Sequence, residues 1–226
     1  MKKHTLFSTL LLLLFSSTSM LLSQRAADPD PTRFAKAIAE FAKDDQETSF
    51  PKGGIIFVGS SSIRRLSIPV VFPGLEALNR GFGGSQISDV NHYLEETVLK
   101  YEPSITVLYC GGNDLWARKP ALQVIEDFLQ FKKQLFERIP EGNLLVLAAR
   151  PSPKRESILE TELAFNYLLK IEAAKDDRIT FIGGACDRFF DNKGNYYLEL
   201  FADDRLHMSD AGYKIWNELL TPHLKR

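Results

Sequence analysis

The stretch Ile55-Ile-Phe-Val-Gly-Ser-Ser-Ser-Ile-Arg64 contains the signal that decides the fold. Its apolar run, Ile55 to Val58, predicts a buried strand that ends at Gly59. Three serines follow, so their hydroxyls stand at the carboxyl end of a strand, where open α/β sheets keep their ligand sites. Serine is also a favoured N-cap residue, and a helix can begin near Ile63. The stretch therefore predicts either a nucleophile, for which we favour Ser61, or a simple helix cap.

Four further apolar runs alternate with helical patterns along the rest of the chain. Parallel strands need long crossover connections, usually helices, so this alternation predicts βαβ units. Continuous apolar runs are typical of strands that are buried on both faces of a sheet. The sequence therefore predicts an α/β fold, with a mostly parallel five-stranded sheet and helices on both faces. We expect strands near 55–58, 76–79, 105–110, 144–149 and 179–182, helices near 31–41, 87–101, 125–139, 158–175 and 209–220, and an irregular connection over 68–74.

The composition is that of an ordinary globular protein. The chain has 226 residues, of which 44% are hydrophobic and 25% are charged, and this suits one domain with a full core. The net charge of -1 creates no overall field that favours nucleic acid or an anionic membrane. We therefore expect no nucleic-acid partner.

Residues 1–23 have the pattern of a secretory signal peptide. Lys2 and Lys3 precede a short apolar run over 10–15, and a Ser/Thr-rich stretch follows it. The apolar part is shorter than a membrane-spanning helix and is interrupted by serines, which favours a cleaved signal peptide. An uncleaved membrane anchor is the alternative. We expect export to the periplasm or the extracellular space, no stable membrane insertion after cleavage, and one domain over residues 24–226.

The two cysteines, Cys110 and Cys186, lie near the ends of different expected strands. Export would permit a disulfide between them, but a sequence does not supply the geometry that a disulfide needs. We expect two semi-buried free thiols. The chain has no C-x-x-C pair, and no His or Cys pair lies at ligand spacing, so we expect no metal and no cofactor.

Three consecutive expected strands end in loops of small residues, at 59–62, 81–85 and 111–114. In a parallel sheet these loops lie at the same edge, and their glycines let the backbone approach a ligand. Asn113 adds an amide donor, and backbone N–H groups together with an Asn amide can form an oxyanion hole. A tight turn explains any single loop. Three such loops at one edge favour a ligand site.

A serine nucleophile needs a base, and His207 is the best-placed histidine. Asp204 stands three residues before it, a spacing at which two side chains can face each other. A carboxylate there can hold the imidazole with its other nitrogen free to accept a serine proton. Asp203 is a rival for this role, and an exposed acidic cap before the last helix is the alternative for the whole segment. The other histidines lie in the signal segment, in an expected helix and in the last turns (His4, His92 and His223).

Four blocks of this sequence, in order, resemble those of the SGNH (GDSL) hydrolases, which are serine esterases with a flavodoxin-like three-layer α/β/α sandwich. The likeness extends from about Gly54 to Tyr213. It implies a catalytic triad of Ser61, His207 and Asp204. It also implies an oxyanion hole made by the Gly84 N–H, the Asn113 amide and the Ser61 N–H. The blocks are Phe57-Val-Gly-Ser-Ser-Ser62, Asn79-Arg-Gly-Phe-Gly-Gly84, Gly111-Gly-Asn-Asp114 and Asp204-Arg-Leu-His207.

One block departs from the pattern of this family. Where the family has Gly-Asp-Ser-Leu, this chain has Gly-Ser-Ser-Ser, so Ser60 replaces the aspartate and Ser62 replaces the leucine. The Gly-x-Ser spacing is intact, which favours Ser61, but Ser60 and Ser62 remain rivals. Serine esterases of the α/β-hydrolase fold carry their nucleophile in a G-x-S-x-G motif. In this chain Ile63, and not glycine, stands two residues after Ser61, so the sequence does not predict an α/β-hydrolase.

The resemblance implies hydrolysis of an ester by two-step acyl transfer, with loss of activity as His207 becomes protonated. The sequence has no long apolar lid segment, which favours short acyl groups. Phe82, Trp116 and Arg150 are candidates to line a sugar-sized pocket, so we expect acetyl or short-chain esters, including those on carbohydrate. The alternatives are a lysophospholipase-like or lipase-like acyl hydrolase, or a non-catalytic carbohydrate-binding relative.

Overall fold

The computed structural model describes residues 25–224 and contains one sheet of five parallel strands. Their order, β2-β1-β3-β4-β5, puts the first strand of the chain inside the sheet and reverses the direction of winding beside it. This is the flavodoxin-like order, with the switch point between β1 and β3. The strands are β1 (Ile55–Gly59), β2 (Ala77–Gly81), β3 (Ile105–Tyr109), β4 (Asn143–Leu147) and β5 (Ile179–Ile182).

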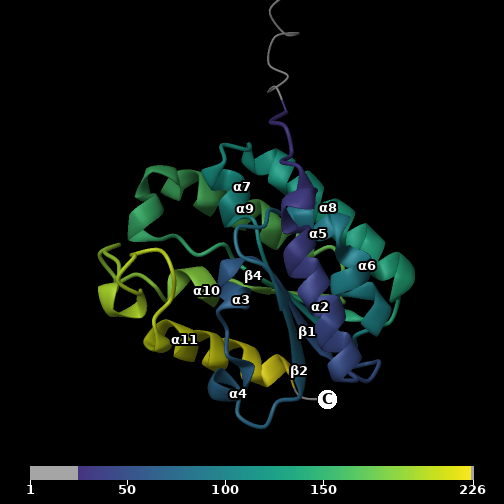
Figure 1. Cartoon of the computed structure of the whole chain (residues 1–226). Coiled ribbons are helices and arrows are strands. Elements are labelled where there is room, and N and C mark those ends of the chain that lie inside the picture. The colour runs from purple at the N-terminus through teal and green to yellow at the C-terminus, as the bar shows by residue number, and fades with distance from the viewer. Residues whose placement is uncertain (1–24, 225–226) are drawn as a thin grey trace, which may run out of the picture.

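Helices cover both faces of this sheet and form a three-layer sandwich (Figure 1). Side chains that alternate along β1 enter two separate cores: Ile56 and Val58 pack on one face, and Ile55 and Phe57 on the other. This alternation explains why the inner strands, β1, β3 and β4, are almost continuously apolar. The first face carries α2 (Ala35–Glu47), α5 (Ile87–His92), α6 (Leu94–Thr97), α8 (Ala121–Arg138) and α9 (Leu159–Ala173); the second carries α3 (Ser61–Arg64), α4 (Ile68–Val71), α10 (Gly184–Asp187) and α11 (Asp210–Leu220). The remaining elements are α7 (Gly112–Trp116), η2 (Pro31–Phe34), η3 (Leu99–Tyr101), η4 (Pro153–Ile158), η5 (Leu198–Leu200) and η6 (Thr221–His223).

The predicted fold class and strands are confirmed, and side-chain caps occur at the starts of two helices. Asp30 accepts a hydrogen bond from the Thr32 N–H at the start of η2, and Ser209 accepts one from the Gly212 N–H at the start of α11. Two local expectations are wrong. Residues 68–71 form the short helix α4 because a proline fits the first turn of a helix. The helix expected over 87–101 is broken into α5, α6 and η3, with non-helical backbone angles at Tyr93 and Val98.

Both cysteines are free, as expected, but both are buried, so the expected partial exposure of these thiols is wrong. Cys110 follows β3, and Cys186 lies within α10. Burial raises the pKa of the Cys186 thiol to about 12. Such thiols act as small core side chains, because the reactive form of cysteine is the thiolate.

The expected signal peptide, residues 1–23, lies outside the described residues. Among residues 25–224, no helix has both the length and the apolar character needed to cross a bilayer.

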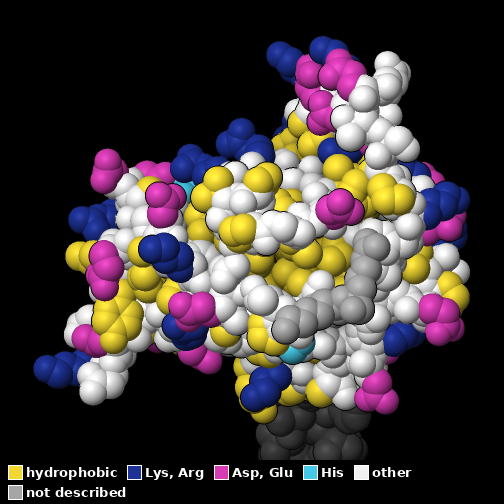
Figure 2. Space-filling model, turned by 90° about the horizontal axis from the view of Figure 1, so that it is seen from below, with side chains coloured by type: hydrophobic (Ala, Val, Ile, Leu, Met, Phe, Trp, Pro, Cys, Tyr) yellow, Lys and Arg dark blue, Asp and Glu magenta, His cyan; other side chains and the backbone are white. Residues whose placement is uncertain are grey.

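The face of the molecule seen from below has hydrophobic side chains in its middle, and charges of both signs are interspersed around them (Figure 2). This face therefore presents no extended region of one charge.

Candidate active site

The serine cluster lies where β1 passes into α3. Gly59 ends the strand at a φ of +132°, and a Cβ atom there would lie 2.0 Å from the Tyr109 carbonyl oxygen. Only glycine fits this approach. The Ser60 N–H then donates to the same carbonyl at 3.0 Å, and Ser61 begins the helix. The serines are therefore both a strand end and a helix start, but the Ser60 side chain makes no capping bond.

Ser61, His207 and Asp204 form a continuous chain of polar contacts. Nε2 of His207 lies 3.0 Å from Ser61 Oγ, and Nδ1 lies 2.6 Å from Asp204 Oδ2. Because an ionised carboxylate can only accept, Nδ1 carries the proton and Nε2 is left to accept from the serine hydroxyl. Within residues 25–224, His207 makes this hydrogen bond to Asp204 and none to the rival carboxylate, that of Asp203.

Asp204 is held as an anion by its own loop. Partial burial opposes ionisation, but the His207 side chain and the backbone N–H groups of Leu206 and His207 donate to its carboxylate, the two N–H groups at 2.9 and 2.8 Å. Together these hydrogen bonds hold the pKa of Asp204 well below its usual range. The short Asp-x-x-His segment therefore fixes both the charge and the orientation of the pair.

The loops after β2 and β3 meet through Asn113. Its Nδ2 donates to the Ser85 carbonyl at 2.9 Å, one residue beyond Gly84. Gly84 is exposed and has a φ of +89°, which favours glycine. Asn113 lines the same small pocket as Ser61 and His207. The structure thus joins the two predicted oxyanion loops and places Asn113 in the pocket of the serine, whereas Gly84 is not among the residues that line this pocket.

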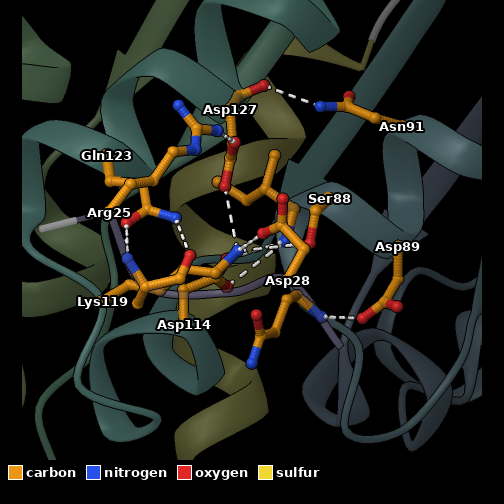
Figure 3. Close-up of polar contacts among 12 residues, drawn as sticks. Arg25, Asp28, Ser88, Asp89, Asn91, Asp114, Lys119, Gln123 and Asp127 are labelled. Carbon is orange, nitrogen blue, oxygen red and sulfur yellow. Dashed lines mark hydrogen bonds and ion pairs between the residues drawn. The ribbon is translucent and has the colours of Figure 1, made fainter. Parts of the chain in front are cut away.

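Buried charges hold these two loops in place (Figure 3). The Asp114 carboxylate, fully buried beside Asn113, accepts from the Ile87 N–H at 3.1 Å and so connects α7 to the start of α5. Lys119 is equally buried and contacts Asp114, Asp127 and Asp28 at 3.4, 3.0 and 2.5 Å. Burial raises the pKa of Asp114 to about 7, against the opposing charge of Lys119 and the Ile87 N–H. The segment that contains Asp28 is thereby tied to the loops of the site.

Three further pocket residues have ionisable side chains, and only Arg150 among them was predicted from the sequence. Arg155 and Glu162 also line the pocket, which has a volume of about 30 Å³. Glu162 is 1% exposed, its Oε2 has no protein partner among residues 25–224, and burial raises its pKa to about 8. Neither residue belongs to a local motif. They reach the pocket because η4 and α9 follow β4 at the same edge of the sheet.

Of the three residues predicted to bind substrate, only Arg150 lines the pocket. Phe82 is 1% exposed and packs edge-on against Phe34 and Tyr93, so its proposed place in the pocket is wrong: it is a core residue. Trp116 is 44% exposed, and its ring faces the Arg155 guanidinium. Arg150 does line the pocket, but its guanidinium is buried and donates to the Leu206 carbonyl at 2.8 Å. In the described part of the chain, no group of three or more His, Cys, Asp or Glu residues could hold a metal ion.

Comparisons with known proteins agree with this architecture. The model of the GDSL-like lipase/acylhydrolase family matches residues 64–215, a span that includes Asn113, Asp204 and His207 and begins just after Ser61. A comparison with curated proteins found no sequence match.

Several solved structures are similar over most of the chain. A protein from Streptococcus pneumonia named for platelet activating factor has a TM-score of 0.76 at 19% identity, with 96% of this chain and 99% of that chain covered. A GDSL-like lipase from Bacteroides thetaiotaomicron has a TM-score of 0.68 at 17% identity, covering 83% and 96%. An acetylxylan esterase from Geobacillus stearothermophilus has a TM-score of 0.58 at 17% identity, covering 78% and 96%. At these identities the likeness shows the shared fold.

Proposed function

Because the chain belongs to the GDSL-like lipase/acylhydrolase family of carboxylic ester hydrolases, we propose that it is a serine esterase of acetyl and other short-chain esters. Ser61 is the nucleophile, His207 is the general base and then the general acid, and Asp204 orients His207. The observation that carries this proposal is the pair of contacts from Ser61 Oγ to His207 Nε2 and from His207 Nδ1 to Asp204, at 3.0 and 2.6 Å.

The reaction proceeds in two steps. Ser61 Oγ attacks the ester carbonyl carbon while His207 Nε2 takes the serine proton, and the carbonyl oxygen becomes an oxyanion. The N–H groups of Ser61 and Gly84 and the Asn113 amide donate to this oxyanion. When the intermediate collapses, the alcohol leaves with the proton from His207, and the acyl group stays on Ser61. Water then attacks this acyl group with the help of His207 and releases the carboxylic acid.

A structural neighbour supports the assignment of the three residues. In the acetylxylan esterase from Geobacillus stearothermophilus, the variants described as catalytic mutants replace a serine, an aspartate and a histidine. That aspartate precedes the histidine by three positions, which is also the spacing of Asp204 and His207.

The size of the pocket favours a small acyl group. The pocket at Ser61 has a volume of only about 30 Å³, which suits an acetyl group better than a long acyl chain. Its walls carry polar groups, the Arg155 guanidinium and the Glu162 carboxyl among them, and a fatty acyl chain prefers apolar walls. An acetylated carbohydrate is therefore our substrate class, consistent with the acetylxylan esterase among the structural neighbours.

Matched serine variants test the nucleophile. We expect Ser61→Ala to abolish p-nitrophenyl acetate hydrolysis and fluorophosphonate labelling, whereas Ser60→Ala and Ser62→Ala keep both. Peptide mapping should place the label on Ser61. An unlabelled wild-type protein would favour the non-catalytic carbohydrate-binding alternative, and labelling of Ser60 or Ser62 would move the nucleophile.

A series of p-nitrophenyl esters and acetylated glycans tests the substrate class. We expect kcat/KM to fall as the acyl chain lengthens from acetate, and acetate to be released from acetylated xylan. A kcat/KM that rises with acyl length would contradict the proposal and favour the lipase-like alternative.

We also propose that residues 1–23 export the protein and are removed. Expression of the full chain followed by cell fractionation and N-terminal sequencing should find a shortened protein outside the cytoplasm. A full-length product in the membrane fraction would instead support the uncleaved anchor.

A further inference from the structure

We propose that Arg155 is a positioning residue for ester hydrolysis: it fixes the Asn113 amide so that one Nδ2 hydrogen points to the oxyanion. This inference rests on the proposed function, because Asn113 serves as an oxyanion donor there. The Arg155 guanidinium donates to Asn113 Oδ1 at 2.8 Å and to the Gly112 carbonyl at 3.0 Å. It therefore holds both the side chain and the preceding backbone of the oxyanion residue.

The chemistry of the two neighbours determines which way the amide faces. An arginine can only donate, so it binds the oxygen of the Asn113 amide. The Ser85 carbonyl can only accept, so it binds the nitrogen, at 2.9 Å. A flipped amide would lose both bonds and place donor against donor at Arg155. One Nδ2 hydrogen is used by Ser85, and the other remains for the substrate.

The position of Arg155 also gives the amide a stronger donor. A hydrogen bond from a cation to the amide oxygen draws electron density from Nδ2 and polarises its N–H groups. The guanidinium itself is part of the pocket wall and is held over the Trp116 ring, 5.4 Å from its centre. Its positive charge is thus fixed near the atom on which negative charge develops during the reaction.

The backbone next to Arg155 is hydrogen-bonded to the loop that carries the catalytic base, His207. Arg155 stands in η4 with non-helical backbone angles, and the preceding N–H, that of Lys154, donates to the Arg205 carbonyl at 3.1 Å. Arg205 lies two residues before His207. The same short segment therefore touches the loop of the base and, through its arginine, the oxyanion donor. Its position in the fold explains why no motif identified it.

A double-mutant cycle with Asn113 tests the proposal. We expect Arg155→Met to lower kcat for p-nitrophenyl acetate by about 10- to 100-fold with little change in KM, somewhat less than the roughly 10²- to 10³-fold cost of removing an oxyanion donor outright. In an Asn113→Ala background, Arg155→Met should lower kcat by less than about 2-fold, because Arg155 acts through Asn113. A residue that only stabilised the fold would lower kcat equally in both backgrounds.

Lys154→Met provides the matched control, since Lys154 is the neighbouring cation and is exposed. It should keep the wild-type kcat. If Arg155→Met is unfolded by circular dichroism, Arg155→Gln takes its place in the cycle. A wild-type kcat in either folded variant, or equal losses in both Asn113 backgrounds, would overturn the role of Arg155. Fluorophosphonate labelling of Ser61 separates these outcomes from a failure of the proposed function, in which wild-type Ser61 would not be labelled.

Discussion

Replacement of Asp204 by asparagine should remove most of the activity without unfolding the chain. In the wild type, the Asp204 carboxylate accepts from His207 Nδ1 at 2.6 Å and from two backbone N–H groups. An Asn oxygen can still accept from these N–H groups, so the loop is retained. Its NH₂ group then faces His207 Nδ1 and donates to it. The imidazole proton moves to Nε2, which can no longer accept the proton of Ser61.

The magnitude follows from how exposed this pair is. In a buried triad, the wrong histidine tautomer costs about 10⁴-fold in kcat. The Asp204 side chain is 43% exposed, so water screens its charge and can supply a replacement acceptor. We therefore expect Asp204→Asn to lower kcat by about 10²- to 10³-fold, which corresponds to roughly 2.7–4 kcal/mol of transition-state stabilisation. KM should change little, because Asp204 is not among the residues that line the pocket.

The assay is steady-state hydrolysis of p-nitrophenyl acetate, with thermal melting followed by circular dichroism to show that each variant is folded. Asp203→Asn is the matched control: this carboxylate is adjacent in sequence and exposed. It should keep kcat within about 2-fold of the wild type. A folded Asp204→Asn protein with wild-type kcat would refute the reasoning, and so would a larger loss in Asp203→Asn.

Three further predictions concern stability. Burial raises the pKa of Glu162 from its ordinary 4.5 to about 8, so between these pH values the folded chain keeps a proton that the unfolded chain releases, and this group makes the wild type less stable as pH rises. Glu162→Gln removes this effect, so the melting temperature of the variant should rise relative to that of the wild type from about pH 5 to pH 8. A difference in melting temperature that stays constant over this range would contradict the prediction. Lys119→Met leaves three carboxylates without their shared cation and should cost about 3–5 kcal/mol in urea unfolding, whereas exposed Lys154→Met should cost almost nothing. Gly59→Ala forces a Cβ atom against the Tyr109 carbonyl and should prevent folding or lower the melting temperature severely; a melting temperature near that of the wild type would show that the β1–α3 turn can relax.

The fold could be predicted from the sequence because the inner strands of its sheet are buried on both faces. Ile105 to Tyr109 and its neighbouring strands are continuous apolar runs between helical segments, and this pattern is strongly constrained by parallel pairing. The helix over 87–101 was misjudged because apolar spacing alone does not report the backbone angles at Tyr93 and Val98. Phe82 was misjudged because an aromatic residue in a glycine loop can point to either side, and burial favoured the core.

By itself, the sequence determined the α/β class with a mostly parallel sheet and the chemical types at the sheet edge: a serine after β1, an asparagine after β3 and an Asp-x-x-His segment. These signals are local, because a strand end, a capping serine or a three-residue spacing acts within a few residues of chain. The Asp-x-x-His spacing already favoured Asp204 over Asp203, but only the tertiary structure brought Ser61 within 3.0 Å of a histidine 146 residues away. It alone also brought Arg155 to Asn113. Such contacts depend on how crossovers stack the loops at one edge, which is a property of the packed sheet and not of any single segment.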